Sequence, residues 1–270
     1  MTHNIGVMPN PSILHALRRL TLLGLLLGAA CGAHAQPAQI TIAVSQNHYP
    51  YTDVEDDKAI GLGPDIVRAA FASMGVTVAF ESMPHHRCVI EAGRGVVMAC
   101  LAVGRDNPHF KSGKLFPSKT PLFAVIPALF ASSESKLQAL TLADLAGKQI
   151  VFPKDANYGD DLERVTRGNR VESLTELTGL RMLMAGRAEL LAGDPRSVGY
   201  LERKYAQELA GRLKVVSQAG GYAGTMGYAA FSKKLADAPH WAALLDQGLA
   251  KIHANGEYER INARWSGQLR

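Results

Sequence analysis

Short apolar runs alternate along this chain with segments whose apolar residues recur at helical spacing. Residues 40–44 are typical of a strand, and the next segment fits a helix that begins near Pro64 and stops at Gly75. The alternation continues with a strand over 76–80, a helix over 85–94 and a buried strand over 96–103. Strands that alternate with helices favour parallel sheets with right-handed crossovers, so the sequence predicts an α/β fold.

A second, similar unit begins near Thr141. A short helix and turn over 142–148 precede a strand over 149–152, and a helix through Leu177 and Arg187 leads to a short strand over 189–192. A helix over 195–209 and an edge strand over 213–216 follow. The chain ends in two helices, 241–253 and 257–265, which Asn255-Gly256 separates.

Two segments are suited to connect these units. One is the apolar, extended stretch 121–131 with Pro127, and the other is the glycine-rich stretch 219–228. Two crossings between two α/β lobes form a hinge, in which a few residues absorb the backbone rotation. We therefore expect lobe 1 to comprise 36–123 plus 226–270, and lobe 2 to comprise 124–225.

The N-terminus has the layout of a secretory signal. Arg18 and Arg19 precede an uncharged, mostly apolar run over 21–33, and the small residues Ala33 and Ala35 flank His34 before Gln36. The apolar run is too short to cross a bilayer core of ~30 Å as a helix. We expect residues 1–35 to be a signal peptide cleaved near Ala35/Gln36, and the mature chain to be periplasmic without a transmembrane segment. Cys31 leaves a lipoprotein open as an alternative, although Gly28 stands where a lipobox usually has leucine.

Several classes of function lack their signatures. The formal net charge is +5 at pH 7, but the lysines and arginines are scattered, and no nucleic-acid-binding module is present. The sequence contains no Gly-x-Ser-x-Gly, His-Glu-x-x-His or phosphate-binding loop, so we expect no enzyme and no cofactor. His85 and His86 have no third ligand at useful spacing, so we expect no metal site.

Two cysteines remain after removal of the signal, Cys88 and Cys100. In an oxidising compartment such a pair can form a disulfide, and two buried free thiols are the alternative.

Several short motifs occur in an order typical of one family. They are His48-Tyr49-Pro50-Tyr51, Gly61-Leu62-Gly63-Pro64-Asp65, Met83-Pro84-His85-His86-Arg87, Leu115-Phe116-Pro117-Ser118, the segment 142–148, Gly186-Arg187-Ala188-Glu189 and the helix pair ending at Trp265. Over about residues 38–267 the chain resembles the family 3 extracellular solute-binding proteins, the periplasmic receptors typical of polar amino-acid transporters. The resemblance implies a type II periplasmic-binding-protein fold with two α/β lobes and a two-segment hinge.

The resemblance also implies a function. A protein of this family captures a small polar solute, an amino acid or a related molecule, by closing its lobes, and delivers it to the membrane permease of an ABC transporter. Two alternatives use the same fold: a ligand-sensing periplasmic partner of a membrane receptor or kinase, and a periplasmic dehydratase-like enzyme.

The sequence offers a candidate residue for each kind of contact that a small polar solute makes with a binding site. A guanidinium grips an anion, a carboxylate holds a cationic group, and aromatic rings wall the site; helix N-terminal amides favour anions. The candidates are Tyr49, Tyr51, His85, Arg87, Arg105, Asn157, Tyr158 and Asp194. The resemblance assigns the acid for a ligand amine to Asp194. The alternatives are core packing for the tyrosines, a helix cap for Asp194, surface positions or salt bridges for the arginines, and a plain turn at Asn157-Tyr158.

One departure from the family lies in the binding site. The register of Leu115-Phe116-Pro117-Ser118 puts Phe110 where the family has the arginine that holds the ligand's α-carboxylate. Arg105 lies five residues earlier. It could supply the anion contact from a new position, it could be the family arginine displaced by a small insertion, or the ligand could lack an α-carboxylate.

Overall fold

The computed structural model describes residues 38–46, 48–154, 156, 158–218, 222 and 224–266. The expected signal peptide and Asn157 lie outside the described residues. No helix in the described part of the chain combines the length and the apolar character needed to cross a membrane.

The first sheet has six strands. They are β1 (Ala38–Ser45), β4 (Val76–Met83), β5 (Ala99–Val103), β6 (Leu115–Pro117), β7 (Phe123–Val125) and β13 (Thr225–Ser232). Their order is β4-β1-β5-β13-β6, with β7 also paired to β13. The strands β4 and β5 run parallel to β1, whereas β13 is antiparallel to all three of its partners. A short hairpin of β2 (Asp53–Glu55) and β3 (Lys58–Ile60) follows β1.

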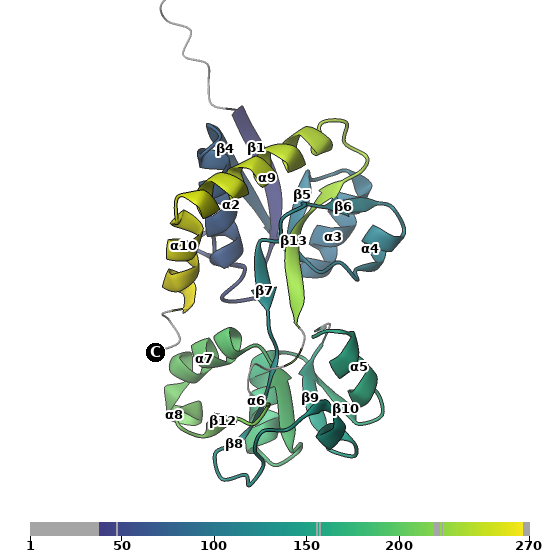
Figure 1. Ribbon diagram of the computed structural model, residues 1–270, viewed down its shortest axis with the longest axis vertical. Helices are drawn as coiled ribbons and strands as arrows, with labels where there is room; N and C mark the ends of the chain where they lie inside the picture. The colour runs from purple at the N-terminus through teal and green to yellow at the C-terminus, as the bar shows by residue number, and fades with distance from the viewer. Residues whose placement is uncertain are drawn as a thin grey trace, which may run out of the picture. The chain divides into compact units, whose positions relative to one another are not determined.

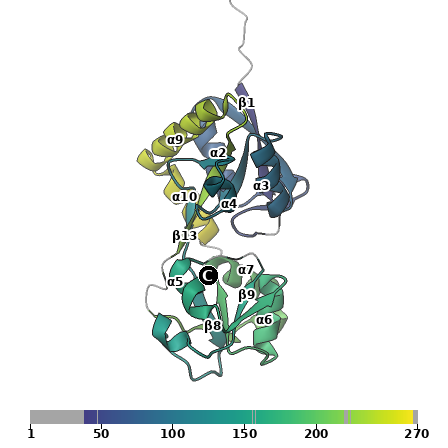
Figure 2. The same ribbon diagram turned by 90° about the vertical axis from the view of Figure 1, so that its right-hand side faces the viewer.

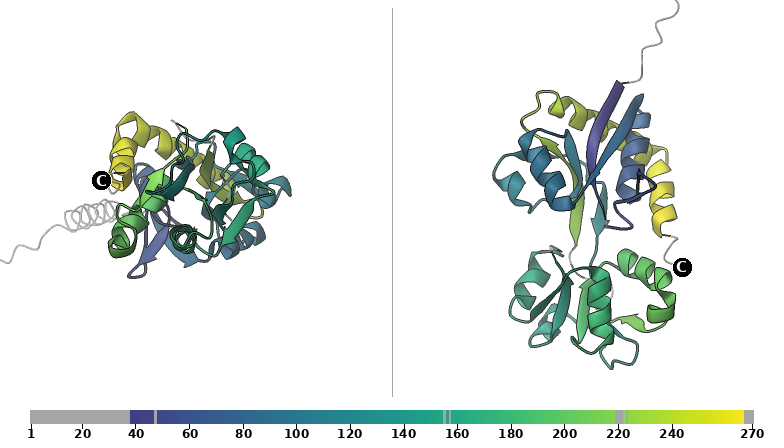
Figure 3. Two further views of the ribbon diagram at one scale, coloured as in Figure 1. Left: turned by 90° about the horizontal axis from the view of Figure 1, so that it is seen from below. Right: turned by 180° about the vertical axis from the view of Figure 1, so that it is seen from behind.

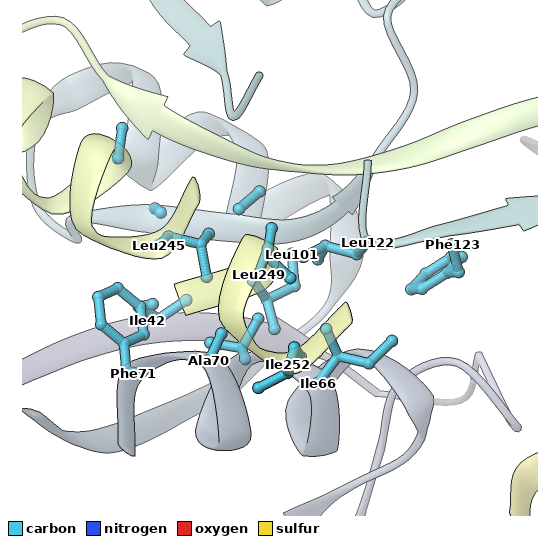
Figure 4. Packing of buried hydrophobic residues seen from close by; sticks show 14 of the residues in the cluster. Ile42, Ile66, Ala70, Phe71, Leu101, Leu122, Phe123, Leu245, Leu249 and Ile252 are labelled. Carbon is cyan, nitrogen blue, oxygen red and sulfur yellow. The ribbon is translucent and has the colours of Figure 1, made fainter. Parts of the chain in front are cut away.

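Helices cover both faces of this sheet (Figure 2). One face carries α2 (Leu62–Ala72), α9 (Ala238–Ala254) and α10 (Glu257–Ser266), and the other carries α3 (His85–Arg94) and α4 (Pro108–Lys111). Alternate residues of β1 serve the two faces, Ile42 toward α2 and Ala43 toward α3. Side chains of α2 and α9 meet in the core on the first face (Figure 4). The two helices come so close that a Cβ atom at Gly248 would lie 2.2 Å from the Ala70 carbonyl oxygen.

The second sheet has five strands in the order β10-β9-β11-β8-β12. They are β8 (Ala128–Ser132), β9 (Ile150–Pro153), β10 (Arg170–Ser173), β11 (Leu190–Gly193) and β12 (Leu213–Val215). One face packs on the 3-10 helix η1 (Leu142–Leu145) and α5 (Asp160–Thr166). The other packs on α6 (Glu176–Met184), α7 (Pro195–Lys204) and α8 (Ala206–Leu209). As expected, β12 is an edge strand.

The expectation of parallel sheets was wrong for part of each sheet. In the second sheet β9 is parallel to β10 and β11, but β8 is antiparallel to β11 and to β12. A crossover helix returns the chain to the start of the next strand, so strands that follow such helices run in one direction. The strands β8 and β13 are instead entered directly from the segments that link the sheets, and they run in the opposite direction.

The strands β7 and β13, which border the two linking segments, pair with each other (Figures 1 and 3). The first segment joins β7 to β8 and the second joins β12 to β13, and Val125 of β7 pairs with Thr225 of β13. A Cβ atom at Gly224 would lie 2.2 Å from the Val125 carbonyl oxygen, so only glycine allows this approach without displacement. The link between β7 and β8 lies in the stretch 121–131, and the link between β12 and β13 overlaps the stretch 219–228. That these stretches form a hinge stays a prediction. The lobe boundaries at 123/124 and 225/226 stay predictions.

A disulfide joins Cys88 of α3 to Cys100 of β5, with a Cα–Cα distance of 5.5 Å. Both residues are fully buried, so the bond ties α3 to the sheet beneath it.

Mass spectrometry should find the native protein lighter than its fully reduced form by the mass of two hydrogen atoms. The double variant C88A/C100A should lose about 3 kcal/mol of unfolding free energy in urea, because closing a loop of roughly 15 residues restricts the unfolded chain by that amount. Two alkylatable thiols in freshly isolated protein would contradict this pairing.

Candidate functional site

The parallel strands of both sheets are followed by polar and aromatic residues. In open α/β sheets ligands bind beyond the carboxyl ends of the strands. In the first sheet the segments after β1, β4 and β5 carry Tyr49, Tyr51, His85 and Arg105. In the second sheet the segments after β9, β10 and β11 carry Tyr158, Glu176 and Asp194. Contacts between Tyr51 and Asp194 and between Tyr49 and the residues after Asp194 join the two sets.

Tyr51 is fully buried in the turn after β1. Its ring packs on Phe123 at 4.5 Å between centroids, and the Arg196 guanidinium lies 5.9 Å from the ring centre. Burial, and next the negative charge of Asp194, raise the pKa of Tyr51. Its hydroxyl is close enough to Asp194 and Arg196 for both to act on its pKa, yet it has no hydrogen-bond partner of normal geometry among the described residues. A buried hydroxyl of this kind is costly unless a polar group meets it.

Tyr49 connects this turn to α7 of the second lobe. Its ring stacks on Tyr200 at 3.6 Å between centroids, and its carbonyl oxygen accepts a hydrogen bond of 2.8 Å from the Ser197 hydroxyl. On the first lobe it meets the edge of Trp265. Arg196 adds a third link, since its Nη2 donates to Asn262 of α10 at 3.1 Å. The N-terminal turns of α7 are therefore in contact with the first lobe.

Asp194 caps α7 and is buried, with 6% of the residue exposed. Its carboxylate accepts a hydrogen bond from the Ser197 amide at 3.2 Å, and Pro195 follows it at the first helical position. Burial raises the pKa of the Asp194 carboxyl, while neighbouring donors and the charge of Arg196 oppose that shift. The helix-cap alternative is thus correct, and the same carboxylate also faces Tyr51 of the first lobe.

Glu176 was not predicted, and it lies directly against Asp194. Its Oε1 accepts a hydrogen bond of 3.3 Å from the Asp194 amide. A Cβ atom at Gly193 would lie 2.7 Å from the same oxygen, so the carboxyl group fills the space beside that glycine. Burial, and next the charge of Asp194, raise the pKa of Glu176 to about 8. One signal could have found it: Glu176 follows β10 at the start of a helix, as Asp194 follows β11.

Tyr158 is buried beside these acids. Its ring lies 6.2 Å from that of Phe152 and belongs to the core around α5. Burial, followed by the charges of Glu176 and Asp194, raises the pKa of Tyr158 well above its ordinary value. Tyr158 therefore packs in the core and also lies close to the two acids.

Arg105 is exposed, and its guanidinium lies 4.7 Å from the centre of the Tyr228 ring. The end of β5 is irregular before it: Ala102 has a φ of 62°, and the pairing with β13 shifts register between Tyr228 and Ala230. Such irregularities turn the following side chain away from its regular direction. The structure gives Arg105 no carboxylate within salt-bridge distance among the described residues.

The remaining candidates lie on α3 and α4. His85 begins α3 and is exposed, close enough to His48 for their charges to interact. Arg87 is exposed on the same helix, 3.9 Å from Glu91, and the structure does not bring it to the other candidates. Phe110 packs against the core that contains Cys88 and Val89, so its apolar side chain serves α4 packing. No group of three or more metal-ligating residues is assembled in the described part of the chain.

Comparison with known proteins adds fold information alone. No protein-family model and no curated protein matches the sequence. Among solved structures, the probable amino-acid ABC transporter extracellular-binding protein ytmK from Bacillus subtilis matches with a TM-score of 0.71 and 15% identity, over 86% of this chain and 99% of that one. A histidine kinase sensor domain with similarity to periplasmic binding proteins matches with a TM-score of 0.68 and 22% identity, over 85% and 96%.

A third match is the arginine-, lysine-, histidine-binding protein ArtJ from Geobacillus stearothermophilus. Its TM-score is 0.66 at 15% identity, over 85% of this chain and 95% of that one. All three matches cover 85–86% of this chain and 95–99% of the other. The chain therefore has the two-lobed α/β fold of the periplasmic binding proteins.

Proposed function

We propose that this chain is a periplasmic solute-binding protein, not an enzyme, that holds a small polar solute between its lobes and delivers it to the permease of an ABC transporter. The observation that carries the proposal is the meeting of buried polar groups from both lobes. Tyr51 of the first lobe faces Asp194 of the second, with Glu176 and Tyr158 beside it. Tyr49 and Arg105 complete the proposed site.

The chemistry of the site favours a ligand with a cationic group. Desolvated carboxyl groups attract a positive charge strongly, and a polar group of the solute would give the Tyr51 hydroxyl a hydrogen bond of normal geometry. An anionic group on the same ligand would find Arg105. Binding that contacts both lobes favours the conformation in which they meet, and that difference in affinity drives closure.

A second candidate function is ligand sensing for a membrane kinase. The similarity to a histidine kinase sensor domain, at a TM-score of 0.68, supports sensing. The similarity to transporter receptors supports delivery to the same degree. Both functions require the same ligand-driven closure. They differ in the membrane partner, which crosslinking of the closed protein to native membranes would identify.

A ligand screen tests the common part of both functions. In a thermal-shift screen of amino acids, opines, polyamines and small carboxylates, a ligand at a hundred times its Kd should add ~2.7 kcal/mol of stability. Small-angle scattering at saturation should then show a smaller radius of gyration than the protein alone. An unchanged radius would contradict closure. Chemical turnover of the hit, followed by mass spectrometry, would favour the dehydratase-like alternative.

A further inference from the structure

Two acids at the proposed site, the buried Asp194 and the half-buried Glu176, lie too close together to act independently. Glu176 reaches across from the start of α6 to the Gly193-Asp194 peptide, and its Oε1 accepts the Asp194 amide proton at 3.3 Å. The carboxyl group occupies the space where any side chain at Gly193 would have its Cβ. Glu176 thereby fixes the main chain at the residue whose carboxylate faces the first lobe.

The surroundings of Glu176 offer it no cation. The charged and titratable groups near it are Asp194 at the end of β11 and Tyr158 in the segment before α5. Of the nearby arginines, Arg170 pairs with Glu163, and Arg196 donates to Asn262. Glu176 itself has no salt bridge within the described residues. The positive charge of Arg196 favours ionisation of Asp194. Asp194 is therefore the acid of the pair that ionises more readily, and a second negative charge on Glu176 is the costly one in a desolvated site.

We propose that Glu176 is a positioning residue for Asp194 that keeps a proton at neutral pH, so the pair of acids presents one negative charge, and not two, to a cationic group of the ligand. The inference rests on the proposed ligand site. The fully buried hydroxyl of Tyr51, which acts on Asp194 without a hydrogen bond of normal geometry, marks the side on which the first lobe meets Asp194. Burial and the charge of Asp194, which raise the pKa of Glu176 to about 8, support the same assignment.

The first test needs no ligand. Carboxyl carbon NMR of the protein labelled at glutamate should show one resonance that titrates near pH 8 and disappears in Glu176→Gln. The exposed Glu189 is a matched control, because it also accepts a backbone amide, that of Gln149 at 3.4 Å, but has no carboxyl neighbour of this kind. Glu189→Gln should leave the resonance near pH 8 in place. Titration of Glu176 near its ordinary value of 4.5 would overturn the proposal.

Thermal unfolding gives an independent readout. A carboxyl group whose pKa is higher in the folded than in the unfolded chain adds stability at low pH, and this part is lost as the pH rises from about 4.5 to about 8. Histidines with lowered pKa values act in the opposite sense over part of this range, so the difference between variants is the informative quantity. The melting temperature of Glu176→Gln, relative to wild type, should rise as the pH rises. A constant difference would contradict the protonated state.

Ligand affinity of two variants then distinguishes the effect of the Glu176 charge from its effect on the position of Asp194. The amide of Glu176→Gln keeps the acceptor for Asp194, so affinity at pH 7 for a guanidinium-containing hit such as L-arginine should stay within about threefold of wild type. Glu176→Ala leaves the Asp194 amide without its partner and should weaken binding about tenfold. Between pH 6 and 8.5 affinity should rise in wild type and stay flat in Glu176→Gln. If no compound of the screen binds, the proposed function fails, while the NMR titration still decides the protonation of Glu176.

Discussion

Asp194→Asn should abolish most of the ligand affinity while leaving the fold intact. Losing one partner of a desolvated charged pair typically costs ~2–5 kcal/mol, much of it because the other charge stays buried without a partner. For a cationic ligand this corresponds to roughly 30- to 5,000-fold weaker binding at ~1.4 kcal/mol per decade. Asparagine has nearly the same volume and is as good a helix cap as aspartate, so α7 should keep its N-terminus.

The experiment is calorimetric titration with the hit of the ligand screen, together with thermal unfolding of each variant. Asp144→Asn is a suitable control, because Asp144 also serves a helix N-terminus of the second lobe, in a capping box with Thr141, but is exposed. That variant should bind as wild type does. If Asp194→Asn binds a cationic hit with unchanged affinity, Asp194 is a cap alone and the proposed site is wrong.

Much of the fold could be predicted because its local signals agree with its tertiary packing. The expected helix 85–94 matches α3 at both ends, where Pro84 precedes it and Gly95 follows with a φ of 81°. The expected helix at 195 begins at Pro195 after the cap Asp194. The strand expected over 96–103 is shorter, because Val96 is exposed and pairing with β1 and β13 begins only near Ala99. Proline, glycine and capping residues act on the neighbouring backbone, so the ends of helices can be predicted from the sequence.

Strand direction and strand partners could not be predicted in the same way. Nothing within 225–232 distinguishes an antiparallel central strand from a glycine-rich link, because the identity of its partners, β5, β6 and β7, depends on segments about a hundred residues away. Long-range pairing of this kind is set by topology and not by local propensity.

In the site, too, local features could be predicted from the sequence and long-range contacts could not. Tyr51 and Asp194 were proposed from the resemblance and Tyr158 from its place after a predicted strand, and the structure brings the three together. Glu176 was missed because its significance comes from contact with the Gly193-Asp194 peptide, 18 residues along the chain. Tyr200 was missed because only the stack on Tyr49 reveals it. A residue whose role is to meet another lobe has no signature of its own in a single sequence.

Arg105 is the second residue whose loss should have a large effect, provided that the ligand carries an anionic group. Its guanidinium lies over the ring of Tyr228, and the end of β5 that precedes it is irregular. A guanidinium offers a carboxylate two parallel hydrogen bonds, which a lysine cannot reproduce. Phe110, which the sequence register puts at the position of the family's arginine, packs against the core beside α3.

Arg105→Ala should weaken binding of an anionic or zwitterionic hit by roughly 30- to 5,000-fold, which corresponds to ~2–5 kcal/mol. Arg105→Lys should recover only part of this loss, since it keeps the charge but not the fork. Arg87→Ala is the matched control, because Arg87 is equally exposed on the first lobe and faces Glu91 of its own helix. All three variants should melt within a few degrees of wild type, because neither arginine belongs to the core. Wild-type affinity in Arg105→Ala for an anionic hit would mean that the anion is held elsewhere, and Arg196, whose guanidinium lies 5.9 Å from the centre of the Tyr51 ring, would be the next residue to substitute.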